Sequence, residues 1–227
     1  MKKNKKETNG NKQKTFWLWK IVPKFAAIPL AAAFGYNMFV FSGTRVINKN
    51  RKYHDMTTKI DRKLPFKPKW VIIYVLAFVQ WITGYLVAAH DGKKTLKRTV
   101  GADVIAKTIT LGCFLAYPTE MERPDADAPE LKGKGFTKWL TRFIYKADAA
   151  NNLFPSIHCL ESWVVYKSSK YLTKKPPFWY RPIMFIMSHL VFASTVLLKQ
   201  HVVADIPAGI AAAEAGYKVM DKIMKDE

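Results

Sequence analysis

Two long apolar runs constrain this chain more than any other feature of its sequence. Residues 21–41 and 70–89 are almost entirely apolar. A helix that crosses the hydrocarbon core of a bilayer needs roughly 20 such residues, with a range of about 17–25. A soluble helical bundle would place a solvated face on each helix, and neither run shows one. The sequence therefore predicts an integral membrane protein.

Four later runs have a similar length but carry more polar residues. The last of them contains many small residues between positions 208 and 216, a composition that permits close helix packing in membranes. The pattern as a whole predicts an all-α, polytopic membrane protein, a bundle of six transmembrane helices with an active site at one membrane face. The four later runs are residues 100–117, 156–172, 182–198 and 202–220.

The distribution of lysine and arginine bears on domains and orientation. Residues 1–15 are rich in Lys and Asn without an apolar period, so we expect a disordered basic tail there and one membrane-embedded domain over residues 16–227. The basic tail favours cytoplasmic termini, as do the basic residues at 93–98, because cytoplasmic loops carry the Lys/Arg excess. The loop at 43–69 is just as basic and opposes this orientation. We expect a protein of the cell membrane with both termini cytoplasmic and the active site extracytoplasmic.

The formal net charge of +20 indicates the kind of partner. Nucleic acid is excluded as a partner by the membrane spans and by the lack of a recognition motif. Anionic lipid is the better match, because juxtamembrane Lys and Arg are attracted to such a surface. The two cysteines, Cys113 and Cys159, lack the spacing of a metal site and are expected as free thiols. The oligomeric state does not follow from the sequence.

Two short motifs carry residue types suited to phosphoryl chemistry. One is the tetrapeptide from Pro155 to His158, and the other is Ser194 followed by His201 and Asp205. His201 and Asp205 are four residues apart at the start of an apolar run, so on a helix they would share a face. Asp205 could then accept the imidazole Nδ1–H and leave Nε2 free to attack phosphorus. Taken singly, a His-x3-Asp pair is more often structural, and a Pro-Ser-x-His segment is often only a helix cap.

Together with Arg123-Pro124 upstream, these motifs resemble the type 2 phosphatidic acid phosphatase superfamily of histidine phosphatases. That family has Lys-x6-Arg-Pro, then Pro-Ser-Gly-His, then Ser-Arg-x5-His-x3-Asp, and the resemblance covers roughly residues 70–220. The chain departs from the pattern at three positions. Ala116 stands where the family has lysine, Ile157 where it has glycine, and Thr195 where it has arginine.

The resemblance implies a role for each matching residue. His201 would form a phosphohistidine, Asp205 would set its tautomer, and His158 would protonate the leaving group and later activate water. Lys199 is the substitute expected for the missing cations, with a structural alternative in which its chain reaches the membrane interface. Ser194 has the alternative of helix packing. No metal and no cofactor is expected. The residues expected to bind the substrate phosphate are Arg123, Ser156, Ser194 and Lys199.

The resemblance implies a metal-independent lipid phosphatase, and two alternatives stay open. The substrate would be a lipid phosphomonoester or diphosphate of the phosphatidate, phosphatidylglycerophosphate or polyprenyl diphosphate type. The first alternative is a headgroup phosphotransferase of the sphingomyelin or inositol-phosphoceramide synthase type, which the Lys-Gln-His-x3-Asp form resembles. The second is a catalytically silent lipid-binding or transport protein, which the missing family cations would suit.

Polar residues inside the apolar runs need partners. Asp103 and Lys107 are four apart, as are Glu214 and Lys218, so we expect each pair to form a structural ion pair. Glu161 follows His158 by one helical turn, and it is a weaker candidate for tuning that histidine.

Overall fold

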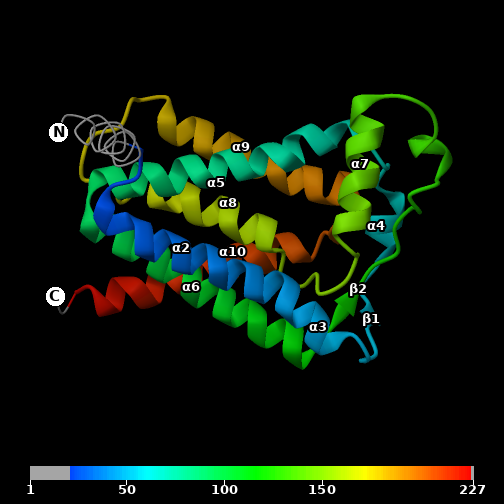
Figure 1. Ribbon diagram of the computed structural model, residues 1–227, viewed down its shortest axis with the longest axis horizontal. Coiled ribbons are helices and arrows are strands. Elements are labelled where there is room, and N and C mark those ends of the chain that lie inside the picture. Colours follow the sequence, from blue (N-terminus) through cyan, green and yellow to red (C-terminus); the bar gives the residue numbers. More distant parts are fainter. Residues whose placement is uncertain (1–20, 226–227) are drawn as a thin grey trace, which may run out of the picture.

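The computed structural model describes residues 21–225, and this part of the chain is mostly helical. The predicted disordered tail at 1–15 lies outside the described residues. Long helices run side by side along the long axis of the molecule (Figure 1). They are α2 (Lys24–Met38), α5 (Val71–Asp91), α6 (Lys93–Ala116), α8 (Ile157–Ser168), α9 (Tyr180–Leu197) and α10 (Asp205–Ile223).

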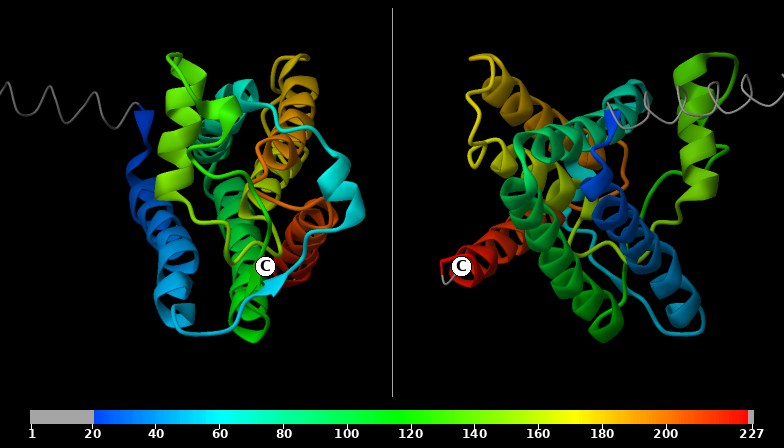
Figure 2. Two further views of the ribbon diagram at one scale, coloured as in Figure 1. Left: turned by 90° about the vertical axis from the view of Figure 1, so that its right-hand side faces the viewer. Right: turned by 60° about the vertical axis from the view of Figure 1, so that its left-hand side comes forward.

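Shorter elements gather at one end of the bundle (Figure 1). Residue 21 and the C-terminal end of α10 lie at the opposite end, and α7 crosses the bundle end instead of running along it (Figure 2). The two short strands pair in parallel, with His54 opposite Thr119 and Asp55 opposite Glu120. The short elements are α3 (Thr44–Asn48), β1 (His54–Asp55), α4 (Lys59–Lys63), η2 (Pro68–Trp70), β2 (Thr119–Glu120), η3 (Pro129–Leu131) and α7 (Phe136–Ala147).

Four helical segments of the described chain are long and apolar enough to cross a membrane, which agrees with a membrane protein. The first includes α2, the π-helical segment η1 (Phe39–Gly43) and α3 in one continuous rod. Two of the six predicted runs correspond to α8 and α10, and these helices do not meet the same criterion. α8 has 12 residues, which gives it a length of about 18 Å. α10 has 19 residues and carries charged side chains along its length. The four segments are Lys24–Asn48, Pro68–Asp91, Lys93–Ala116 and Tyr180–Leu197.

The small residues of α10 predicted close helix packing, and two of its glycines allow α10 to approach α8 and α6 closely. A Cβ on Gly209 would lie 2.7 Å from the backbone oxygen of Ser156, at the start of α8. A Cβ on Gly216 would lie 2.1 Å from the backbone oxygen of Ala102 in α6. These distances leave no space for a side chain, so α10 approaches both neighbours at backbone contact. The start of α10 is thereby held next to the start of α8.

The expected ion pair between Asp103 and Lys107 is present in the middle of α6, with 2.8 Å between Nζ and Oδ2. Lys107 also pairs with Glu161 of α8. Glu161 therefore does not tune His158, because its carboxylate binds Lys107 and accepts a hydrogen bond of 2.8 Å from Tyr85.

The expected pair between Glu214 and Lys218 does not form. Glu214 faces α8, where Lys167 Nζ lies 2.6 Å from its carboxylate and Trp163 Nε1 donates to it at 2.7 Å. Lys218 is exposed. The packing of α10 on α8 selects a partner on another helix over the one in the next turn.

Candidate active site

The imidazole of His201 is bound by Asp205, as the spacing predicted. Nδ1 lies 2.9 Å from Asp205 Oδ2, and both side chains are buried. The two residues were predicted to share a face of one helix, but α10 begins at Asp205 and His201 lies in the loop before it. The same Oδ2 accepts the backbone N–H of Val202 at 3.1 Å. A carboxylate that accepts at Nδ1 leaves the lone pair on Nε2.

His158 lies in the first turn of α8 and shares a cavity with His201. The centroids of the two imidazole rings are 5.9 Å apart. The His158 ring stacks on Tyr74 at 4.3 Å and lies 5.2 Å from the ring of Trp81, so two aromatic side chains of α5 fix its orientation. His158 Nε2 is buried and has no hydrogen-bond partner. An unpaired buried polar atom is unfavourable, and a polar ligand would relieve it.

The cavity itself is small and polar. Its volume of about 20 Å³ is enough for water but not for a phosphate group. Gln200 Nε2 and Asn151 Oδ1 resemble His158 Nε2 in being buried without a partner. Side chains with donors, acceptors or charge that line the cavity are Arg45, Asp148, Asn151, Asn152, His158, Gln200 and His201.

Arg45 is a cation in this cavity that the sequence did not single out. It extends from α3 and pairs with the carboxylate of Asp148, and its Nη2 donates to the backbone oxygen of Ala149 at 3.0 Å. The guanidinium lies 4.1 Å above the ring of Phe41. Arg45 lies more than a hundred residues before His158 in a generally basic stretch, so no motif spacing pointed to it.

Arg123 lies beside the cavity and binds protein carbonyls. Its Nη1 donates to the backbone oxygen of Asp148 at 2.8 Å and to Gln200 Oε1 at 3.2 Å, and its Nη2 donates to the oxygen of Tyr145 at 2.9 Å. Burial lowers the pKa of the Arg123 guanidinium. The fork predicted to bind phosphate therefore already holds the loop before α8 and orients Gln200 into the cavity.

Lys199 does not reach the cavity, contrary to its predicted role as a phosphate ligand. Its Nζ donates to the backbone oxygens of Asp61 and, at 2.7 Å, of Leu64. Burial lowers the pKa of the Lys199 ammonium, and the nearby Asp61 carboxylate opposes that shift. The backbone of Lys199 turns through a left-handed conformation, with φ 52°. The side chain is directed toward α4, and its hydrogen bonds attach the loop that contains His201 to that helix.

The serines predicted to bind phosphate act within their own helices instead. Ser156 Oγ caps α8 by accepting the backbone N–H of Cys159 at 3.3 Å. Ser194 Oγ donates to the backbone oxygen of Val191 at 2.7 Å, in α9. Both residues are fully buried, and neither lines the cavity. These are the contacts that the helix-cap and helix-packing alternatives describe.

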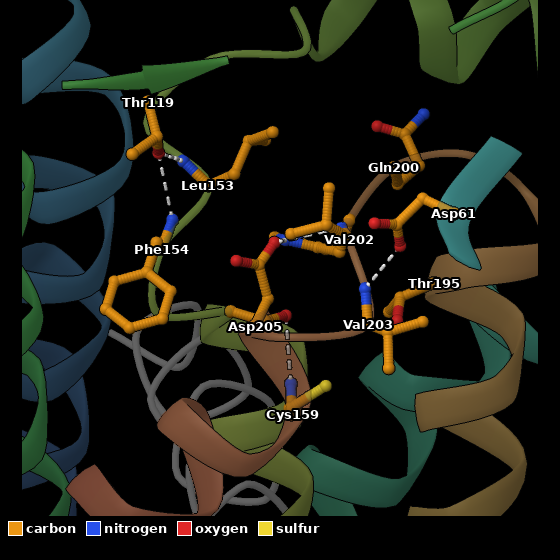
Figure 3. Close-up of polar contacts among 12 residues, drawn as sticks. Asp61, Thr119, Leu153, Phe154, Cys159, Thr195, Gln200, Val202, Val203 and Asp205 are labelled. Carbon is orange, nitrogen blue, oxygen red and sulfur yellow. Dashed lines mark hydrogen bonds and ion pairs between the residues drawn. The ribbon is translucent and has the colours of Figure 1, made fainter. Parts of the chain in front are cut away.

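Asp61 in α4 positions the loop that contains His201, a role that the sequence did not predict. Its Oδ1 accepts the backbone N–H of Val203 at 2.7 Å (Figure 3). Its Oδ2 accepts the backbone N–H of Thr58 at 2.9 Å. Burial would raise the pKa of Asp61, but the hydrogen bonds from Thr58 and Val203 hold it below its usual value. The Thr58-x-x-Asp61 pattern is a capping box, and this was the signal available in the sequence.

Thr119 in β2 holds the other side of the site. Its Oγ1 accepts the backbone N–H groups of Leu153 and Phe154, at 2.9 and 3.1 Å (Figure 3). These residues lead directly into the start of α8, so the paired strands fix the path of the chain to His158.

The assembled groups place two imidazoles and a guanidinium at one cavity. An imidazole with a free nitrogen can act as a nucleophile or transfer a proton, and a guanidinium can bind an anion. In this structure Arg45 is paired with Asp148. Within residues 21–225, no three His, Cys, Asp or Glu side chains converge as they would in a metal site, and Cys113 and Cys159 are free thiols. The chain matches no protein-family model, and no curated protein matches it either.

Proposed function

We propose that the protein is an integral membrane phosphatase that hydrolyses a lipid phosphate through a phosphohistidine on His201. The observation that carries this proposal is the pair of histidines in one cavity, one of them held by a carboxylate through Nδ1. The resemblance of the motifs to the type 2 phosphatidic acid phosphatases supports the same reading.

In the first step, the lone pair of His201 Nε2 attacks phosphorus and the bond from phosphorus to the lipid oxygen breaks. His158 donates a proton to that oxygen, and the lipid alcohol leaves. Asp205 stabilises the positive charge that develops on the His201 ring. The stack of His158 on Tyr74 keeps the ring oriented during the proton transfer.

In the second step, water attacks the phosphohistidine. Neutral His158 accepts a proton from the water, the bond between nitrogen and phosphorus breaks, and inorganic phosphate leaves. His201 returns to its starting state, and His158 is again protonated for the next substrate. Positioning and charge neutralisation supply most of the rate enhancement in phosphoryl transfer.

Asp148 occupies the anion-binding position in the closed cavity. Its carboxylate pairs with Arg45 and accepts a hydrogen bond of 3.2 Å from Tyr74. A substrate phosphate would replace this carboxylate on Arg45, and the cavity would widen as the loop at 148–153 moves. Arg45 thus takes the part of the family cations missing at Ala116 and Thr195.

We infer a six-span arrangement in which α8 lies inside the bundle and α10 packs along α6 and α8 at its edge. Most residues of α8 are buried in the bundle and do not contact lipid. A short helix with polar residues is therefore compatible with a position inside the membrane. The site then lies at the face opposite the termini, which is the extracytoplasmic face of the cell membrane if the termini are cytoplasmic. The substrate is a phosphomonoester or diphosphate of a membrane lipid, of the phosphatidate, phosphatidylglycerophosphate or polyprenyl type.

Phosphate release from these lipids by the purified full-length protein in detergent micelles tests the proposal. We expect release in the presence of EDTA, loss of release by about 100-fold or more in His201→Ala, and acid-labile phosphate on the wild-type protein. His189→Ala is the matched control, because His189 lies on α9, does not line the cavity, and hydrogen-bonds to the backbone oxygen of Phe185.

Other outcomes identify the alternatives. Transfer of labelled phosphate or headgroup to an added lipid alcohol, in place of release, would make the protein a phosphotransferase. Folded protein that neither releases nor transfers phosphate from any of these lipids would refute an enzymatic function and leave a lipid-binding or transport role.

A further inference from the structure

A second, larger cavity lies between α2, α5, α6 and α8, with a volume of about 280 Å³. Its rim is formed by exposed apolar side chains of α2 and α5, namely Phe34, Phe78 and Ile82. Its inner wall is charged and consists of Asp103, Lys107 and Glu161. An apolar cavity with a few convergent polar groups is the usual form of a small-molecule site.

The charged wall has acceptors that lack a donor. Asp103 and Glu161 both bind Lys107, so two carboxylates share one ammonium group. Asp103 is fully buried, and its Oδ1 has no hydrogen-bond partner. Asn37 Oδ1, in the same wall, is also buried without a partner. Two acceptor oxygens without a donor therefore lie just behind the surface of the cavity, in a wall that has one more carboxylate than ammonium groups.

The position of the cavity limits the occupant to a lipid. Asp103 and Lys107 lie in the middle of α6, one of the helices apolar enough to span a membrane. The exposed side chains at the rim belong to two other such helices. In a bilayer this rim contacts the hydrocarbon chains, so a ligand reaches the cavity from the membrane, and most of its length must be apolar.

The charge of the wall limits the polar group of that lipid. A phosphate would be repelled by the excess carboxylate, and any ionised group is expensive to bring to this depth. A hydroxyl is neutral, leaves water at a far lower cost, and donates a hydrogen bond to an acceptor such as Asp103 Oδ1. We propose that this cavity binds a membrane lipid with a free hydroxyl group, with the hydroxyl on Asp103 and the hydrocarbon chain between α2 and α5.

This site is separate from the histidine cavity. The two cavities have no lining residue in common. Trp81 lines the larger cavity, and the centroid of its ring lies 5.2 Å from that of His158. A lipid alcohol is also what dephosphorylation of a lipid phosphate releases. The binding proposed here does not depend on that reaction, and His201→Ala should bind the alcohol as the wild type does.

Photolabelling of the purified full-length protein tests the proposal. The probe is a long-chain primary alcohol with a diazirine in its chain, and the competitors are the unlabelled alcohol and its methyl ether, which has no donor. We expect labelled peptides from α2 and α5, with competition by the alcohol about two- to tenfold stronger than by the ether, the effect of one hydrogen bond.

Substitutions on α2 and α6 locate the site. Ala33→Phe fills the cavity and should abolish the competed labelling, whereas Ala32→Phe, on the exposed face of the same helix, should leave it unchanged. Asp103→Leu removes the acceptor oxygen, and Lys107 still has Glu161 as its ion-pair partner. This variant should bind the alcohol more weakly than the wild type. Asp103→Asn, which retains an acceptor oxygen, should bind more tightly than Asp103→Leu, and thermal melting of each variant verifies folding.

Three results would overturn the proposal. Equal competition by the methyl ether would show that the cavity accepts any hydrocarbon chain. Labelling that Ala33→Phe does not reduce would place the probe elsewhere on the protein. Stronger competition by a long-chain ammonium ion than by the alcohol would show that the negative wall selects a cation.

Discussion

At the scale of single residues, the site depends on polar atoms whose partners come from distant parts of the chain. His201 is oriented from within its own segment, by Asp205. Arg45, which lines the cavity together with the histidines, is instead supplied by α3 and neutralised by Asp148. A charge-assisted hydrogen bond from such a cation is stronger than a neutral one.

Arg45→Gln tests the assignment of this cation to phosphate binding. Loss of a hydrogen bond to a charged group is worth about 1.5–3 kcal/mol, so kcat/KM for the lipid phosphate should fall by about 10- to 100-fold. Arg62→Gln is the control, because Arg62 is exposed, does not line the cavity, and binds the surface carboxylates of Asp55 and Glu122 and the backbone oxygen of Thr57. Equal kcat/KM in Arg45→Gln and wild type would show that the phosphate is held by other groups.

Asp61 makes the stability depend on pH in a defined direction. Its pKa is lower in the folded protein than in the unfolded chain, because Thr58 and Val203 hydrogen-bond to its charged form. The resulting stability is present above the unfolded pKa of about 3.9 and is lost as the pH falls through the lower folded pKa. In melting curves, Asp61→Asn should be less stable than wild type at neutral pH, and the difference should narrow below about pH 4. A constant difference across this range would contradict the assignment.

At the scale of elements, the distance between the two histidines follows from how α8 and α10 meet. Gly209 lets α10 touch the backbone of Ser156 at the start of α8. The backbone N–H of Ser156 in turn donates to the oxygen of Asp205 at 3.4 Å. On the other side, α4 holds the His201 loop through Asp61 and Lys199.

Gly209→Ala should therefore separate the two helices. The added methyl group meets backbone atoms that cannot rotate away, and overpacking of this kind costs about 1–3 kcal/mol. We expect a lower melting temperature together with a fall in kcat. Gly112→Ala in α6 is the control, because its Cβ meets nothing within 4 Å, and it should stabilise the helix by about 0.5–1 kcal/mol. A Gly209→Ala protein with normal kcat would show that the site tolerates a shift of α10.

At the scale of the whole molecule, the histidine site lies at one end of the bundle, and the start of α2 and the end of α10 lie at the other (Figure 1). The end that holds the site also carries α7, whose aromatic side chains Phe136, Trp139 and Phe143 are exposed and stack on one another at 5.9 Å. Exposed aromatic rings of this kind are enriched at the interface between membrane and water.

Single cysteines test the six-span arrangement. Lys134→Cys lies at the site end and Lys175→Cys follows α8 at the other end, and both positions are exposed. In cells, an impermeant thiol reagent should label Lys134→Cys from outside, and Lys175→Cys only after permeabilisation. A background with Cys113→Ser and Cys159→Ser removes the native thiols, and the unsubstituted background serves as the control. Labelling of both positions from the same side would contradict six spans.

The sequence by itself determined the features that depend on neighbouring residues. Apolar runs predicted the membrane helices, small residues predicted the close packing of α10, and the spacing of His201 and Asp205 predicted their contact. These are properties of a few consecutive turns or of one short loop, so composition and spacing are enough to reveal them.

Only the tertiary structure decided which side chains from distant segments meet. Lys199 is directed to α4, Glu214 to α8, and Arg45 to the histidines, because helix packing places these partners nearer than any neighbour in sequence. Long side chains such as Lys and Arg reach several directions from one backbone position, and the direction taken depends on the partner that burial makes available.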